Sequence, residues 1–380
     1  MAGCSSVDSN QILHSDSRAT VVKIGHAAPL SGNMARVGKD NENGVRMAID
    51  ELNSRGVEIG GQRVRLQLDS EDDLWSADGA KDAARRLIDA GVVGVIGHLS
   101  SQCSIAASEI YAKANIPQVS PSSTNPDYTG RGLKTTFRMV ANDNVQAVAL
   151  ASFVAGVIKA KRVAILDDQT KYGQELAGRF AEAINAKGVS IIARSSVEGH
   201  ATDFSKELQE FKDFNPDIVF FGGMDVQAGL LIKQMKELGL NARLVGGDGM
   251  QTKEFIRLAG DSAEGQYASQ PAAWTKQMPR YAEFEEKYNR KFHSDFILYS
   301  PYAYDATMVM LDAMRRAGST DPEKYLPELK KEDYKGITGR ICFDENGDIV
   351  ESPLVIYQVK NSKWVVASAV TISGPMLPIQ

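Results

Sequence analysis

The sequence predicts an α/β protein made of two doubly wound open-sheet lobes that are joined by a hinge of several strands. Its 380 residues are too many for one compact core and fit two domains. Apolar strand-like segments alternate with amphipathic helix-like segments, which is typical of a parallel sheet covered by helices on both faces. This alternating series occurs twice. The C-terminal remainder is too short for a third lobe, so we expect it to complete the first two.

The first series begins at residue 21. Its helix-like segments carry apolar residues at spacings of three and four, and the first of them is closed by Gly56. The run 92–97 is apolar throughout, as expected for a strand that is covered on both faces. The predicted strands are 21–28, 63–69, 92–97 and 118–120, and the predicted helices are 45–52, 80–90 and 105–114.

A second series follows a junction near residues 138–142. Its predicted strands are 162–166, 190–194, 218–221 and 243–245, and its helices are 145–158, 174–186, 204–211 and 228–238. The tail adds helices at 281–288 and 302–316 and strand-like segments at 338–343 and 354–359, with a turn at 344–348 between them. We therefore predict a disordered tether (1–20), an N-terminal lobe (21–140 plus 270–345) and a C-terminal lobe (141–269 plus 346–380).

Composition excludes several classes of function. The chain has 43 Lys and Arg against 48 Asp and Glu, a formal net charge of −5, which lacks the basic surface that nucleic-acid binding needs. No run of about 18 apolar residues is present, so we expect no membrane-spanning segment. The three cysteines and five histidines have no metal-ligand spacing, so we expect no metal and no cofactor.

The N-terminus begins Met1-Ala2-Gly3-Cys4 and continues as a polar stretch without periodicity. Ala-Gly-Cys resembles the end of a bacterial lipoprotein box, in which the cysteine is acylated, so Cys4 is a predicted lipid attachment site. The charged and apolar parts of a signal peptide do not precede it in this sequence. The alternative is a chance cysteine in a flexible tail.

Small hydroxyl residues follow two predicted strands of the first series. Because ligands of open parallel sheets bind at the carboxyl ends of strands, beside helix N-termini, these residues favour an anion such as a carboxylate. Ordinary capping of the following helix is the alternative for each motif alone. The two segments are His98-Leu99-Ser100-Ser101-Gln102 and Pro121-Ser122-Ser123-Thr124.

Two segments of the second series also lie at strand ends. One contains Tyr172 within residues 167–173, and the other is Gly246-Gly247-Asp248-Gly249. Asp248 places a single carboxylate toward the gap between the lobes, where it suits an ammonium group; a turn residue is the alternative. Together the four segments predict a site for a zwitterion, with hydroxyls and amides for its carboxylate and an acid for its amine.

From residue 21 to about residue 369 the chain resembles a type I periplasmic solute-binding protein of the leucine/isoleucine/valine-binding family. The resemblance rests on the order and spacing of five motifs. These are Pro29-Leu30-Ser31-Gly32, Val95-Ile96-Gly97-His98-Leu99-Ser100-Ser101, Ser120-Pro121-Ser122-Ser123-Thr124-Asn125-Pro126, Lys171-Tyr172-Gly173 and Phe343-Asp344-Glu345-Asn346-Gly347-Asp348. It implies two lobes linked by three crossovers that close over an amino acid and deliver it to an ABC permease.

The resemblance also implies roles for single residues. Ser101 matches the family's carboxylate-binding serine, and Thr124 matches the threonine that touches both carboxylate and ammonium. Ser122 matches a residue whose carbonyl accepts from the ammonium, and Tyr172 matches the tyrosine of the far lobe that contacts the ligand on closure. Asp248 stands where the family commonly has a glutamate as counter-ion of the ammonium.

Some positions depart from the family pattern. Val37 replaces the aromatic lid of leucine binders, and Met224 replaces a second far-lobe tyrosine. Trp75 and Ser100 stand at the two positions of the near-lobe disulfide. We include Val37, Ser100 and Met224 among the predicted ligand-binding residues. We expect Trp75 to pack at the edge of the lobe, with stacking on a ligand as the alternative, and Cys103 to be packed rather than reactive.

The sequence thus predicts an extracytoplasmic, periplasmic receptor that captures an aliphatic or otherwise apolar amino acid and is not an enzyme. We expect a monomer whose partners are the ligand and an ABC permease. Two alternatives stay open: a ligand-sensing receptor ectodomain on the same scaffold, and a receptor for a carboxylate without an amine. An enzyme of the dehydrogenase or kinase type is disfavoured because GxGxxG, GxxxxGK[ST] and GxSxG motifs are absent.

Overall fold

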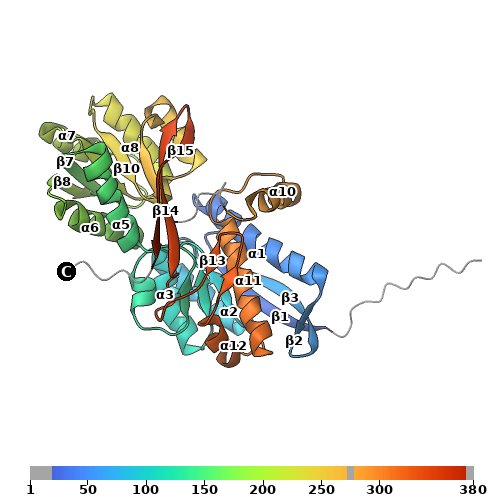
Figure 1. Ribbon diagram of the computed structural model, residues 1–380. Coiled ribbons are helices and arrows are strands. Elements are labelled where there is room, and N and C mark those ends of the chain that lie inside the picture. The colour runs from blue at the N-terminus through green and yellow to red at the C-terminus, as the bar shows by residue number, and fades with distance from the viewer. Residues whose placement is uncertain (1–18, 272–277, 374–380) are drawn as a thin grey trace, which may run out of the picture.

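The computed structural model describes residues 19–271 and 278–373, which form two lobes with a long hairpin of strands running between them (Figure 1). Each lobe is a twisted sheet with helices on both faces. The chain passes between the lobes after β6, between β11 and α10, and between β13 and β14. The predicted fold class, two α/β lobes joined by three crossovers, is confirmed.

The sheet of the N-terminal lobe has the strand order β2-β3-β1-β4-β5-β6. All its pairings are parallel except that of β2 with β3. Its strands are β1 (Thr20–Ala28), β2 (Val57–Ile59), β3 (Gln62–Asp72), β4 (Val95–Gly97), β5 (Gln118–Ser120) and β6 (Thr136–Arg138). The other elements of this lobe are α1 (Ala35–Arg55), α2 (Ala77–Asp89), α3 (Ser101–Lys113), α4 (Asp127–Gly130), α10 (Tyr281–Phe292), α11 (Ser300–Ala317), α12 (Pro322–Leu329) and the pair β12 (Tyr334–Lys335) and β13 (Arg340–Ile341).

The sheet of the C-terminal lobe has the order β15-β14-β11-β10-β9-β7-β8, in which β14 pairs antiparallel with both neighbours. Its strands are β7 (Arg162–Asp167), β8 (Ser190–Ser196), β9 (Ile218–Gly222), β10 (Arg243–Gly246), β11 (Tyr267–Gln270), β14 (Glu351–Lys360) and β15 (Lys363–Ser373). Its helices are α5 (Asp143–Phe153), α6 (Lys171–Asn185), α7 (Ser205–Phe214), α8 (Asp225–Glu237) and α9 (Lys253–Ala259), with short helical turns η1 (Val154–Ile158), η2 (Asp248–Met250) and η3 (Gly260–Ala263).

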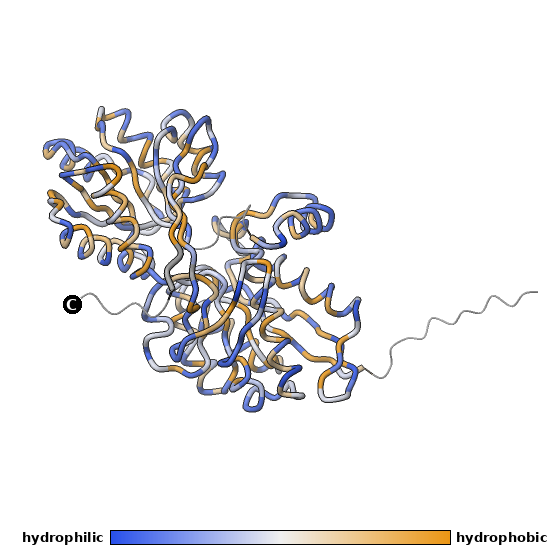
Figure 2. Tube along the Cα trace, viewed as in Figure 1, coloured by the Kyte–Doolittle hydropathy of each residue, from blue (hydrophilic) through white to orange (hydrophobic). Residues whose placement is uncertain are grey.

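Each sheet has an apolar cluster on both faces. In the N-terminal lobe α1 and α11 pack on one face and α2 and α3 on the other. In the C-terminal lobe α5 and α6 cover one face, while α7, α8 and α9 cover the other. The hydropathy colouring accordingly runs hydrophobic along the strands and hydrophilic along the outer helices (Figure 2). Sheets buried on both faces explain why the strands read as continuous apolar runs.

Several helices begin at the cleft with a side-chain cap, which fixes the turn from strand to helix there. The hydroxyl of Ser100 accepts from the backbone N–H of Cys103, and that of Thr170 accepts from Gly173. Such caps satisfy backbone donors that have no partner in the helix. They place the strand ends that carry the candidate ligand groups in defined positions.

A buried ion pair joins two of the three crossovers. Arg138, fully buried at the end of β6, donates to Asp348 in the turn before β14, with 2.6 Å between Nε and Oδ1. The same guanidinium donates to the carbonyls of Ser123 and Asn125 (2.9 and 3.0 Å). The hinge and the loop that carries Thr124 are therefore held by one side chain.

The structure corrects three details of the predicted elements. The strand expected at 338–343 is only the two-residue β13, which pairs with β12. The strands β2 and β15 were not predicted, and both join the edges as antiparallel hairpins, so the sheets are mixed rather than purely parallel. The helix expected at 145–158 is α-helical only to Phe153 and continues as the π-helical turn η1. The three residues of β2 and the two residues of β13 are too few for a period-two pattern to be recognised.

Within the described ranges no helix is long and apolar enough to cross a membrane.

Cys103 is buried, and its thiol donates to the carbonyl of Ser76. Burial raises the pKa of this thiol far above its ordinary range, so it is packed and protonated, as expected. The predicted lipid attachment site Cys4 lies outside the described residues.

Candidate functional site

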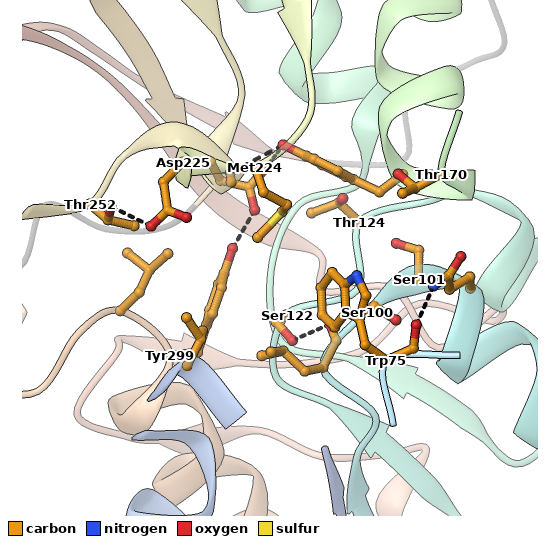
Figure 3. A pocket seen from close by; sticks show the side chains of 17 residues that line it. Trp75, Ser100, Ser101, Ser122, Thr124, Thr170, Met224, Asp225, Thr252 and Tyr299 are labelled. Carbon is orange, nitrogen blue, oxygen red and sulfur yellow. Dashed lines mark hydrogen bonds between the residues drawn. The ribbon is translucent and has the colours of Figure 1, made fainter. Parts of the chain in front are cut away.

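A pocket lies between the two lobes, at the carboxyl ends of their strands, and contains about 610 Å³ of empty space including its open mouth. All eight residues predicted to bind ligand line this single pocket, and Figure 3 labels Ser100, Ser101, Ser122, Thr124 and Met224 among them. Their contact with a ligand stays a prediction. The eight are Val37, Ser100, Ser101, Ser122, Thr124, Tyr172, Met224 and Asp248.

The N-terminal lobe supplies hydroxyl groups and the start of helix α3. Ser101 is the first residue of α3, where free backbone N–H groups and the helix dipole favour an anion. Its hydroxyl accepts from the backbone N–H of Asn125 (3.2 Å), so it retains its own proton for donation. Ser122 donates its hydroxyl to the carbonyl of Leu99 (2.7 Å). This wall can therefore bind a carboxylate without any cationic side chain.

Buried hydrogen bonds fix the loops that carry these groups. The hydroxyls of Ser104 and Ser123 lie 2.6 Å apart, and those of Ser104 and Ser120 both donate to the carbonyl of His98. The imidazole of His98 is itself bonded to Asp73 through Nδ1 (2.8 Å). Because every member is buried and paired, this wall is rigid before any ligand arrives.

The C-terminal lobe supplies Asp248, the carboxylate predicted from the sequence to meet an ammonium. Its Oδ1 accepts from the hydroxyl of Tyr172 and from Nε2 of Gln146, both at 3.0 Å. Gln146 also accepts from the backbone N–H of Asp248 (3.1 Å) and is bonded by the hydroxyl of Ser269. The direction of the carboxylate is thus set by the start of α5.

Tyr299 reaches Asp248 from the opposite lobe. It precedes α11, and its hydroxyl donates to Oδ2 of Asp248 in the bond drawn as a dashed line in Figure 3. Asp40 of α1 positions this tyrosine, because its carboxylate accepts from the backbone N–H groups of Ile297 and Leu298 on the same loop (2.9 and 3.1 Å). The lobes are therefore closed over the pocket.

A second carboxyl group stands behind Asp248. Asp143 is fully buried, and Nε2 of Gln146 donates to both carboxyls, 3.0 Å from each. Burial raises the pKa of Asp248, against the effect of its three donors, and burial together with the charge of Asp248 raises the pKa of Asp143 well above its usual range. Two neighbouring buried carboxyls disfavour a second negative charge, and of the two only Asp248 lines the pocket.

Two further contacts cross the cleft. Arg36 of α1 forms an ion pair with Asp225, the first residue of α8, whose carboxylate also accepts from the hydroxyl of Thr252 (2.6 Å). Asn125 donates to the carbonyl of Lys171 (2.9 Å). Asp225 is buried and lines the pocket, so its charge is compensated by a residue of the other lobe.

Several pocket residues were not found from the sequence. Tyr299, Leu298 and Thr252 lie in loops whose residues carry no motif. Gln146, which does not line the pocket but holds Asp248, lies inside a helix and was not found either. Trp75 was expected at the edge of the lobe; it does pack against the core there, but it also lines the pocket. The signal available for Trp75 was its position directly after β3, at the same sheet edge as the hydroxyl motifs.

The fold and the pocket define a bilobal ligand-binding protein that encloses a small molecule between its lobes. The polar groups of the pocket include hydrogen-bond donors at the start of α3 and the carboxylate of Asp248. No group of three or more His, Cys, Asp or Glu side chains suitable for a metal occurs in residues 19–271 and 278–373. The chain belongs to the periplasmic binding protein family, whose model matches residues 21–363. This is a family of solute-binding proteins and not of enzymes.

Similar proteins include binders of branched-chain amino acids. A "Leucine-, isoleucine-, valine-, threonine-, and alanine-binding protein" of Pseudomonas aeruginosa is 30% identical over 340 residues, 90% of either chain. A Leu/Ile/Val-binding protein homolog of Brucella abortus is 33% identical over 341 residues, covering 89% of this chain and 90% of the relative. The crystal structure of a leucine-binding protein from Thermotoga maritima has a TM-score of 0.85 at 30% identity, covering 92% of this chain and 98% of that one.

Proposed function

We propose that the protein is the solute-binding receptor of an ABC transporter and that it captures an apolar amino acid by closure of its two lobes. The observation that carries this proposal is the placement of opposite recognition groups in one pocket. The start of α3 with Ser101 and Thr124 favours a carboxylate, and Asp248 favours an ammonium. A ligand that carries both charges satisfies both groups at once.

The ammonium still has a free position on Asp248. A carboxylate offers about four lone-pair sites. Three are used here, two on Oδ1 and one on Oδ2. The carbonyl of Ser122 and the hydroxyl of Thr124 are the further acceptors we assign to the amine.

The side chain of the ligand meets apolar surface. Val37, Leu99, Met224 and Leu298 line the same pocket as the polar groups. Burial of apolar ligand surface against such groups contributes favourably to binding, by about 25 cal/mol for each Å². We therefore assign an aliphatic or otherwise apolar amino acid rather than a charged one. Relatives named for leucine, isoleucine and valine support this choice.

A carboxylate without an amine is the second candidate. It is favoured by the three protein donors to Asp248, which occupy most of the acceptor positions of this carboxylate and reduce its need for an ammonium. We assign the protein to the periplasm or another extracytoplasmic space, as a monomer that docks on a permease; a membrane anchor at Cys4 is part of this proposal. Sensing through a membrane partner is the alternative to uptake.

A thermal-shift screen tests the proposal. The protein is unfolded and refolded to remove carried ligand, and is then heated with each proteinogenic amino acid and with matched carboxylic acids that lack the amine. A ligand that binds only the folded state raises the midpoint of unfolding. We expect shifts with apolar amino acids. A shift with amine-free acids alone selects the second candidate, and the absence of any shift contradicts both.

A further inference from the structure

The indole of Trp75 occupies a special place in the pocket. Trp75 follows β3 in the loop before α2 and is half-buried, and Figure 3 shows its ring system standing inside the pocket. Leu74 and Trp75 both have positive φ angles (55° and 54°). Two consecutive residues with side chains rarely adopt this left-handed conformation, and such residues concentrate at ligand-binding positions.

Hydrogen bonds hold this backbone in place. The backbone N–H of Leu74 donates to the carboxylate of Asp72 (2.9 Å), and that of Trp75 donates to Asp73 (3.0 Å). Gln102, at the start of α3, donates to the carbonyl of Trp75 (2.8 Å). Since Asp73 is buried and bonded to His98, the backbone that carries the indole is held by the interior of the lobe.

The indole N–H has no acceptor among the residues that the structure describes. The other described tryptophan differs: Trp364 donates its N–H to the carbonyl of Thr252 at 2.8 Å. The nitrogen of Trp75 is not fully buried, so its N–H can donate to a group that enters the pocket, and a tryptophan N–H usually finds a partner once it is buried. In Figure 3 the nitrogen of Trp75 is on the side of its ring where Thr124 and Ser101 are drawn. These are the groups assigned to the ligand's carboxylate.

We propose that Trp75 is a specificity-determining residue that donates its indole N–H to the carboxylate of the bound ligand. This inference rests on the proposed function. It adds a neutral donor to those of Ser101 and Thr124 in a wall that lacks a cationic side chain among the lining residues. A neutral donor strengthens binding of a carboxylate and leaves the net charge of the pocket to Asp248 and the ligand's amine.

The test compares an acid with its amide. The first ligand is the amino acid that gives the largest shift in the thermal-shift screen. The second ligand is the same compound with a carboxamide in place of its carboxylate (L-leucine and L-leucinamide if leucine gives the largest shift). Trp75→Phe keeps a ring and removes the N–H, and Tyr325→Phe is the control outside the pocket, because the hydroxyl of Tyr325 bonds to the carbonyl of Val93. We expect Trp75→Phe to weaken binding of the acid about ten- to a hundredfold in calorimetry and binding of the amide about two- to tenfold, because a neutral amide oxygen accepts a weaker bond than a carboxylate.

Equal losses for acid and amide would mean that the ring only fills space, and no loss for either would remove Trp75 from the site. A second measurement, by NMR, uses the wild-type pocket. The indole N–H resonance of Trp75, assigned by elimination with Trp364→Phe and Trp274→Phe, should shift downfield in the wild-type protein when the acid binds. An unshifted resonance overturns the inference while the proposed function stands. Wild-type protein that binds no amino acid overturns the proposed function and this inference with it.

Discussion

The hydroxyl of Tyr299 donates a hydrogen bond to the carboxylate of Asp248 across the cleft between the lobes. Tyr299 belongs to the N-terminal lobe and Asp248 to the C-terminal lobe, so the bond exists only in the closed arrangement. The same carboxylate is the group we assign to the ligand's ammonium. Asp248 therefore takes part both in the contact between the lobes and in the proposed recognition of the ligand. A ligand that orients Asp248 also favours the closed state.

Removal of the hydroxyl of Tyr299 should weaken both the closed state and the binding of the ligand. We expect Tyr299→Phe to lower the affinity for the preferred amino acid by about 1.5 kcal/mol, because a hydrogen bond to a charged group is lost. Small-angle scattering of the unliganded variant should give a larger radius of gyration. Tyr325→Phe is the control, since the hydroxyl of Tyr325 bonds to the carbonyl of Val93 within the N-terminal lobe. Unchanged affinity in Tyr299→Phe would contradict the role of this contact.

Asp248→Asn tests the assignment of the ammonium. The variant keeps the shape and removes the negative charge, so we expect the affinity for the amino acid to fall by about 2–4 kcal/mol. The matching acid without an amine should bind the variant at least as well as the wild type. Calorimetry measures the affinity for both ligands. An equal loss of affinity for both would show that Asp248 acts by holding the structure of the pocket and not through its charge.

The ion pair of Arg36 and Asp225 should stabilise the closed state. Arg36 is about one-third exposed (31%), so we expect Arg36→Ala to weaken ligand binding by only about 1 kcal/mol, and less at high salt. Arg46→Ala is the matched control, because Arg46 lies on the same helix and pairs with Glu42 within it. Titrations at low and high ionic strength provide the measurement. Equal effects of the two variants would exclude a role in closure.

His26 makes the stability of the protein depend on pH. Burial lowers the pKa of His26 to about 4, from 6.5 in the unfolded chain. Between these values the unfolded chain binds a proton that the folded protein does not, so the free energy of unfolding should fall by up to about 3 kcal/mol as pH drops from 6.5 to 4. Denaturation of His26→Gln across this range should show a smaller slope; an identical slope would refute the assignment.

Gly44 allows α1 and α11 to approach closely. A Cβ atom at this position would lie 2.2 Å from the carbonyl oxygen of Ser300. We expect Gly44→Ala to destabilise the protein by about 2 kcal/mol in denaturant unfolding, because backbone must shift. At Gly178 in α6 the nearest atom is 3.9 Å away, so Gly178→Ala should stabilise by about 0.5 kcal/mol. Similar effects of both substitutions would contradict the packing argument.

Much of the fold could be predicted from the sequence because each sheet is covered on both faces. Strands such as β4 and β9 are then apolar throughout and stand out between amphipathic helices. The hydroxyl motifs and Asp248 were recognisable because strand ends of a parallel sheet gather at one edge. The strand β15 was missed because its burial alternates from Trp364 to Ala369 while its polarity does not: exposed positions such as Val365 and Val370 also carry apolar residues.

The contacts that complete the site were decided by tertiary structure alone. The sequence by itself determined the class of fold, the edge where ligand groups gather and the identity of eight pocket residues. It did not indicate Tyr299, which reaches Asp248 from a loop 51 residues further along the chain. Nor did it indicate the ion pair of Arg36 with Asp225, 189 residues apart. Periodicity reports which face of an element is buried, whereas contacts across a cleft depend on how two separately folded lobes meet.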